Sequence, residues 1–147
     1  MIQIKLEHAT KGLTAYLELT DRLSIVTGNS GTGKTHLCSM IQASLDEDNG
    51  VFTISAYDTV TKKETSVYFA RSTQILQQLL TDPATERSVI VCDEYTTDKL
   101  YKEPALRNNL TERESHFLLF SRDYKTIAPT AKIVELLYIN KTYKFST

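Results

Sequence analysis

The sequence predicts an α/β domain in three layers, with a mainly parallel central sheet and antiparallel strands at its edges. Three observations predict this class. Short apolar runs rich in β-branched residues are typical of buried parallel strands, a glycine-rich loop joins one of them to an amphipathic helix, and two other runs alternate apolar with polar residues. The chain has 147 residues, 41% of them hydrophobic and 24% charged, which is the size and composition of one globular domain over residues 1–147.

The N-terminal part of the chain is expected to form a hairpin followed by a buried strand. Apolar residues alternate with polar ones over 2–6 and again over 15–19, and a turn is expected at Lys11-Gly12. Alternation with a period of two predicts strands that bury one face. Residues 23–27 (LSIVT) form a short apolar run with β-branched residues, which predicts a strand buried on both faces.

Beyond residue 35, helix and strand signals continue to the end of the chain. Apolar residues at three- and four-residue spacing predict a helix over 37–45, and Ser72 is placed to cap a second helix that Asp82-Pro83 ends. The remaining strands share a short apolar or alternating pattern between turn residues, and they lie at 51–57, 65–70, 88–92, 116–120, 133–139 and 143–145. The last two are expected to pair as a closing hairpin across Asn140-Lys141.

Residues 96–115 are expected to be helical in part. Pro104 suits the first turn of a helix, and Thr111 with Glu114 matches a capping box. The pattern leaves the boundaries of these helices open.

A phosphate-binding loop is predicted at 28–35, where GNSGTGKT matches G-x-x-x-x-G-K-[ST]. A match of this kind arises by chance in about half a per cent of chains of this length. The match also follows a predicted strand and opens a predicted helix, an arrangement that aims backbone N–H groups and the helix dipole at an anion. A nucleoside triphosphate is therefore the expected ligand, and a plain glycine-rich turn is the alternative.

Each residue type in the loop has a physical role. Glycines let the backbone wrap a phosphate, Lys34 supplies a mobile charge to the β- and γ-phosphates, and the Thr35 hydroxyl is placed to ligate Mg²⁺. His36 follows as the next polar position of the helix. The predicted nucleotide-binding segment is therefore Gly28, Asn29, Ser30, Gly31, Thr32, Gly33, Lys34, Thr35 and His36.

A second motif lies at 89–93, where VIVCD combines four apolar residues with Asp93, and Glu94 follows directly. With this pair of motifs the chain resembles the P-loop NTPase superfamily, in particular the ATPases of ABC and AAA type that carry a glutamate after this aspartate. The resemblance implies that Asp93 holds Mg²⁺ together with Thr35, and that Glu94 activates the attacking water. Two acids that merely end a strand are the alternative.

The third buried strand, HFLLF, ends in Ser121-Arg122. In the ATPases that the chain resembles, a polar residue at this place senses the γ-phosphate, which implies Ser121 as a nucleotide-binding residue and Arg122 as a catalytic one. The sequence departs from the family in showing no LSGGQ-like signature, and no C-terminal helical domain is expected at this length.

The resemblance implies Mg²⁺-dependent ATP binding and slow ATP hydrolysis, coupled to regulation of a protein or nucleic-acid partner. Slow turnover is expected because no internal arginine finger is evident, so a protein partner or a second copy of the chain would supply the arginine. Three other arginines are weaker candidates, each expected to be a solvated surface charge: Arg71, Arg107 and Arg113.

Two alternative functions stay open. One is a small-molecule kinase, which uses the same loop and needs an acceptor pocket, here sought between Arg107 and Arg122. The other is a nucleotide-gated binding or inhibitor module of a phage or mobile element, with little catalysis.

Composition and sequence patterns limit the expected partners and location of the protein. The net charge of −1 and the pI near 6.3 give no support to a nucleic-acid coat protein, although a local nucleic-acid contact stays open. Neither a secretory signal nor a membrane span is expected, so a cytoplasmic location with buried thiols at Cys38 and Cys92 is predicted. The three histidines lack metal-ligand spacing, and Tyr143 occupies the place of the aspartate in a guanine-reading N-K-x-D.

Overall fold

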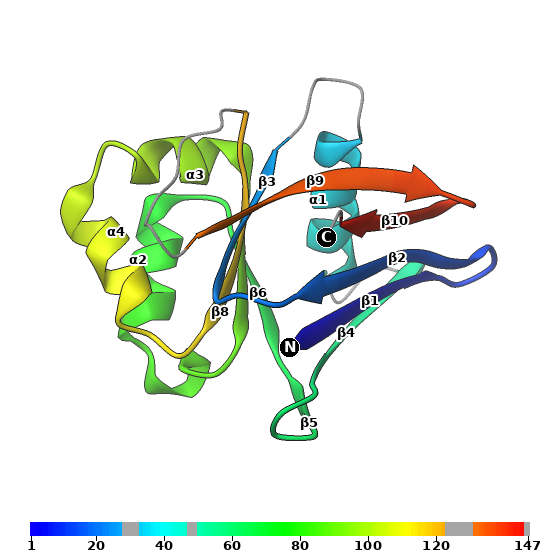
Figure 1. Cartoon of the computed structure of the whole chain (residues 1–147), viewed down its shortest axis with the longest axis horizontal. Coiled ribbons are helices and arrows are strands. Elements are labelled where there is room, and N and C mark those ends of the chain that lie inside the picture. Colours follow the sequence, from blue (N-terminus) through cyan, green and yellow to red (C-terminus); the bar gives the residue numbers. More distant parts are fainter. Residues whose placement is uncertain (28–32, 47–49, 123–130, 146–147) are drawn as a thin grey trace.

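The computed structural model describes residues 1–27, 33–46, 50–122 and 131–145 (Figure 1). The described strands form one ten-stranded sheet in the order β5-β4-β1-β2-β10-β9-β3-β8-β7-β6. The strands are β1 (Ile2–His8), β2 (Gly12–Leu19), β3 (Leu23–Thr27), β4 (Phe52–Asp58), β5 (Lys63–Thr65), β6 (Val67–Ala70), β7 (Val89–Cys92), β8 (His116–Phe120), β9 (Lys132–Ile139) and β10 (Thr142–Phe145). The helices are α1 (Lys34–Ser44), α2 (Thr73–Thr81), the short 3-10 helix η1 (Pro83–Thr85), α3 (Glu94–Leu100) and α4 (Pro104–Thr111).

The strands β9, β3, β8, β7 and β6 are adjacent in this order and are parallel to one another. Every residue of β3 and of β7 is buried, as the apolar, β-branched sequences of 23–27 and 88–92 predict. The expected parallel sheet with the strand 23–27 inside it is confirmed, because β3 lies between β9 and β8.

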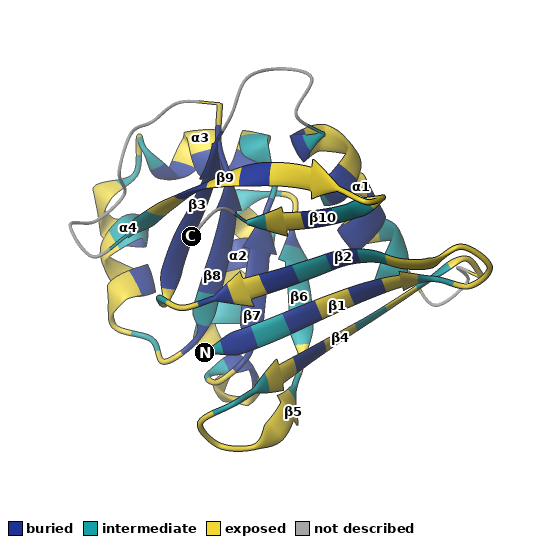
Figure 2. Ribbon diagram, turned by 45° about the vertical axis from the view of Figure 1, so that its right-hand side comes forward, coloured by how far each residue is buried: buried dark blue, intermediate teal, exposed yellow. Residues whose placement is uncertain are grey.

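The antiparallel strands form more than edges. The expected hairpin of β1 and β2 is present, β1 also pairs with β4, and β4 pairs with β5. β10 pairs antiparallel with β9 and touches β2 in parallel at Tyr143 and Ala15. Five of the strand pairings are therefore parallel and four antiparallel, and the antiparallel strands make a wing that continues from the parallel part across β9 (Figures 1 and 2).

Two apolar clusters define the layers. The first joins α1 to the antiparallel wing and to one face of the parallel strands, through residues such as Leu37, Ile41, Leu17 and Phe120. The second covers the other face of the parallel strands with α2, α3 and α4. Helix α1 is thus enclosed between the two parts of the sheet, with buried positions along its inner face (Figure 2).

Two local expectations are wrong. The run 65–70 is not one strand: it divides at Ser66, so that β5 pairs with β4 while β6 pairs with β7. The capping box is also absent, because Thr111 is the last residue of α4 and its hydroxyl donates to the carbonyl of Asn108. The Glu114 carboxylate instead pairs with Arg87.

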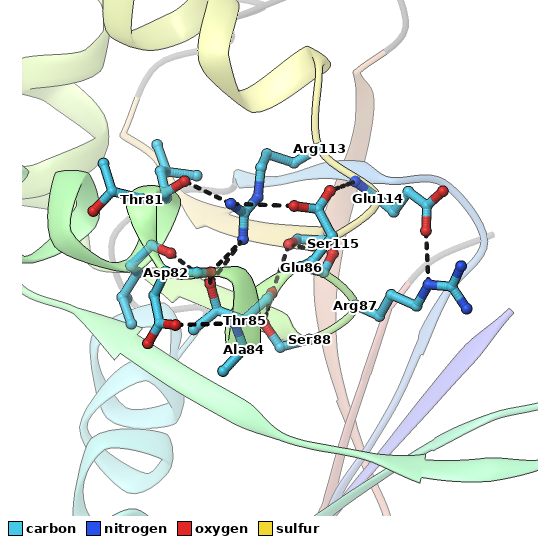
Figure 3. A network of polar contacts seen from close by, with 12 residues as sticks. Thr81, Asp82, Ala84, Thr85, Glu86, Arg87, Ser88, Arg113, Glu114 and Ser115 are labelled. Atoms are coloured by element: carbon cyan, nitrogen blue, oxygen red, sulfur yellow. Dashed lines mark hydrogen bonds and ion pairs between the residues drawn. The ribbon is translucent and has the colours of Figure 1, made fainter.

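Arg113 is not the solvated surface charge that the sequence suggested. Its side chain is only 11% exposed and lies 3.2 Å from the Glu86 carboxylate. Its guanidinium also donates to the Thr85 hydroxyl and to the carbonyl of Leu80 (Figure 3). Ser115 completes the network by donating to the carbonyls of Thr85 and Glu86. The network ties α2 and η1 to the segments that enter β7 and β8.

Within the described residues, no helix has the length and apolar character needed to cross a bilayer. Both cysteines are free thiols; Cys92 is buried, as expected, and Cys38 is partly buried.

Candidate nucleotide site

Three segments that are distant in the sequence meet at the carboxyl ends of neighbouring strands. Gly33 and α1 follow β3, Asp93-Glu94 follows β7, and Ser121-Arg122 follows β8, which lies between the other two strands. Of the predicted phosphate-binding loop, Gly28, Asn29, Ser30, Gly31 and Thr32 lie outside the described residues. The described part of the site therefore begins at Gly33.

Gly33 is the N-cap residue of α1, and two features of the structure favour a glycine there. Its φ is +92°, which side chains with a Cβ rarely adopt. A Cβ at this position would also lie 2.7 Å from ring atoms of Tyr143. The carbonyl of Gly33 accepts from the N–H of Leu37 at 2.8 Å, and as a glycine this N-cap residue offers no side-chain cap to the first turn of the helix.

The Lys34 ammonium is buried at the centre of the site. Its Nζ donates to the Ser121 carbonyl at 3.0 Å and lies 3.7 Å from Oε1 of Glu94. The other carboxylate oxygen of Glu94 is 2.6 Å from Nε of Arg122. A buried ammonium is stable only with such partners, so Lys34, Glu94 and Arg122 form one connected charge group.

The structure gives Asp93 a role in capping a helix. Its Oδ1 accepts from the N–H of Thr96 at 2.8 Å and thereby caps α3. Thr35 is exposed in the first turn of α1, next to Lys34. A hydroxyl and a carboxylate are hard oxygen donors of the kind that Mg²⁺ prefers, so the chemistry of Thr35 and Asp93 fits that ion.

A cavity of about 280 Å³ opens beside Glu94. The buried Ser121 hydroxyl exchanges a 2.8 Å hydrogen bond with the phenol of Tyr101 at its wall. The residues that line the cavity are Glu94, Tyr95, Asp98, Tyr101, Ser121 and Arg122. Charged and hydroxyl groups thus surround a space that adjoins the Lys34–Glu94 pair.

Cys38 lies one helical turn after Lys34, and its pKa responds to burial and to the charges of Asp93 and Glu94. Burial and then the negative charges of Asp93 and Glu94 raise the pKa of the Cys38 thiol to about 12. The pKa of Cys92 is raised as well, first by burial and then by Asp93. Neither thiol is a thiolate at neutral pH, so both remain neutral groups beside the site.

Two tyrosines at the site carry no sequence signal of function. Tyr101 lies in the segment expected to be helical only in part, and its contact with Ser121 depends on how α3 packs on β8. In the sequence Tyr143 is only a mismatch to a guanine-reading motif, yet its phenol lies 3.2 Å from Nδ1 of His36. The structure thus places His36, a predicted segment residue, against the C-terminal hairpin.

The comparison with known protein families agrees with this geometry. Residues 24–131 match the family described as ATPase family associated with various cellular activities (AAA). The matched segment runs from β3 to the residue before β9 and includes Lys34, Glu94 and Ser121. A comparison with curated proteins finds no match.

Proposed function

Because the chain belongs to the AAA family of ATPases, we propose that it is a Mg²⁺-dependent ATPase that turns over slowly alone and regulates a partner. Family membership indicates ATP binding and hydrolysis. The observation that carries the proposal is the position of Lys34, whose buried ammonium lies 3.7 Å from the Glu94 carboxylate. A phosphate held by Lys34 would lie within one water molecule of Glu94.

Each residue has a role in this proposal. Lys34 binds the β- and γ-phosphates, and Glu94 orients or deprotonates the attacking water. Thr35 and Asp93 would hold Mg²⁺, which supplies neutralising charge to the phosphate oxygens when bound. Ser121, buried next to Lys34, and Arg122 would face the γ-phosphate.

Slow turnover is supported by the contact of Arg122. Its Nε lies 2.6 Å from a carboxylate oxygen of Glu94. In this arrangement Arg122 therefore forms an ion pair that holds the Glu94 carboxylate in place. A catalytic arginine from a protein partner or a second copy of the chain is proposed to raise the rate, by up to about 10³- to 10⁵-fold.

The roles of Glu94 and Lys34 are tested with two variants. Glu94→Gln is expected to lower kcat for ATP hydrolysis by about 10²- to 10⁴-fold and to retain ATP binding, because the amide keeps the shape but cannot accept a proton. Lys34→Ala is expected to lose ATP binding. Phosphate release and equilibrium binding of labelled ATP measure the two effects.

Glu114→Gln is the matched control, since Glu114 also pairs with an arginine but at the exposed surface. It should leave kcat unchanged. Equal and robust hydrolysis by the wild-type chain and Glu94→Gln would contradict the role proposed for Glu94.

The cavity beside Glu94 favours a second candidate function, transfer of the γ-phosphate to a small molecule. Its volume of about 280 Å³ and its lining of Asp98, Tyr101 and Ser121 suit a small polar acceptor. Product analysis with γ-labelled ATP and a metabolite extract separates the two functions. Label in free phosphate supports the ATPase, and label in a small organic molecule supports the kinase.

A further inference from the structure

An aromatic group flanks the start of α1 on the side away from Glu94. Tyr138 of β9 and Tyr143 of β10 are paired across the C-terminal hairpin, with ring centroids 4.7 Å apart at an angle of 42°. Tyr143 also meets His36 edge to face at 6.1 Å. The hairpin that carries both tyrosines passes alongside α1 (Figures 1 and 2).

The two tyrosines differ in exposure. Tyr143 is only 8% exposed, because its ring is seated against Gly33 and its phenol contacts His36. Tyr138 is 59% exposed and rests on Tyr143. A mostly buried inner ring thus supports an outer ring that is open to a ligand.

The register of β9 places Tyr138 at the level of the site. β9 pairs with β3 as far as Thr27 opposite Glu135, so Tyr138 lies three residues beyond the end of β3. At a rise of about 3.3 Å per residue this is about 10 Å past the strand end. That is the end of the sheet at which α1 begins.

The direction of the nucleotide follows from the charges. Glu94, Arg122 and Lys34 gather on the β8 and β7 side of β3, where the proposed function puts the terminal phosphate. β9 and β10 lie on the other side of β3. A triphosphate that lies across the start of α1 therefore points its nucleoside toward the hairpin, past His36.

We propose that Tyr138 is the stacking platform for the nucleobase, with Tyr143 as its fixed support. The inference rests on the proposed nucleotide binding and adds a subsite to it. Stacking uses the face of the base, so this subsite takes any purine and contributes affinity rather than discrimination between adenine and guanine.

The test compares a nucleotide with its phosphate chain alone. Tyr138→Ala, Tyr138→Phe and the wild-type protein are titrated with Mg²⁺-ATP and with Mg²⁺-tripolyphosphate, by displacement of a fluorescent ATP. Tyr138→Ala is expected to weaken ATP binding by roughly 5- to 150-fold with tripolyphosphate binding unchanged. Tyr138→Phe is expected to keep ATP affinity, because the phenyl ring still stacks.

Tyr57→Ala is the matched control, since Tyr57 is 40% exposed on β4 in the antiparallel wing. The proposal is overturned if Tyr138→Ala leaves ATP affinity unchanged, if it weakens ATP and tripolyphosphate equally, or if Tyr57→Ala has the same effect. A wild-type protein that binds neither ligand would overturn the proposed function itself.

Discussion

Lys34 illustrates how single residues make the site. Its ammonium is held by the Ser121 carbonyl and the Glu94 carboxylate, so the protein itself fixes the cation at the ends of the strands. A flexible lysine that reached the same point from solvent would lose side-chain conformational entropy about several rotatable bonds when it bound phosphate. In the proposed function, the burial of Lys34 therefore preorganises the cation for the phosphate.

The two thiols allow a prediction at this scale. Because burial and the charges of Asp93 and Glu94 raise the Cys38 pKa from 9.0 to about 12, the thiolate fraction at pH 8 falls about a thousandfold. Both cysteines are expected to react very slowly with Ellman's reagent in the native protein and at full rate in denaturant. Fast labelling of the native protein at pH 8 would contradict this.

The sign of the pH effect follows from the same shift. A pKa that is raised on folding stabilises the protein fully below the unfolded pKa, here 9.0, and this stabilisation is lost as pH rises toward 12. Cys38→Ala is therefore expected to reduce the loss of stability between pH 9 and 11. Urea denaturation at a series of pH values measures it.

At the scale of elements, the helices differ in how they begin. The Ser72 hydroxyl accepts from the N–H of Ile75 at the start of α2, and the Asp93 carboxylate does the same for Thr96 at the start of α3. Helix α1 begins at Gly33 with no side-chain cap. A first turn without a side-chain cap is what the proposed phosphate site would require, because the phosphate oxygens would accept from its N–H groups.

The connection between α2, η1 and β8 depends on Arg113. Because this buried guanidinium has several hydrogen bonds and an ion pair (Figure 3), Arg113→Ala is expected to lower the free energy of unfolding by about 2–4 kcal/mol. ATP binding should be unchanged, because the network precedes β7 and β8 while the site follows them. Urea denaturation and ATP titration measure the two quantities.

Arg87 offers the matched control. It pairs with Glu114, but both side chains are mostly exposed, so Arg87→Ala is expected to change the free energy of unfolding by less than about 1 kcal/mol. If Arg113→Ala cost no more than Arg87→Ala, the network would have no structural role.

On the scale of the whole molecule, α1 joins the two parts of the sheet. Its buried residues Leu37, Met40 and Ile41 pack in one cluster with residues of both the antiparallel wing and the parallel strands. A ligand bound at the start of α1 therefore contacts a helix that packs against both parts of the sheet. Binding there is expected to stabilise the molecule as a unit.

This coupling gives a measurable shift. Mg²⁺-ATP at a hundred times its Kd should raise the free energy of unfolding by about 2.7 kcal/mol and the Tm by roughly 5–10 °C. Thermal melts of the wild-type chain and of Lys34→Ala measure it, and the variant should show no shift. An equal shift in both proteins would place ATP away from Lys34.

The sequence by itself determined the elements whose signals are local. The alternation of β1 and β2, the apolar runs of β3, β7 and β8, and the cap at Ser72 all depend on residues within a few positions of one another. The phosphate-binding loop was predicted on the same basis from the G-x-x-x-x-G-K-[ST] match, and the family match supports a P-loop ATPase. The roles of the two acids after β7 stay predictions.

Only the tertiary structure decided which of these elements are neighbours. β8 lies between β3 and β7, which is why Ser121 contacts Lys34 and why Arg122 reaches Glu94. The burial of Arg113 and the seat of Tyr143 against Gly33 have the same origin. Local periodicity predicts that one face of an element is buried. Which element covers that face depends on the strand order, and the strand order depends on contacts between residues far apart in the chain.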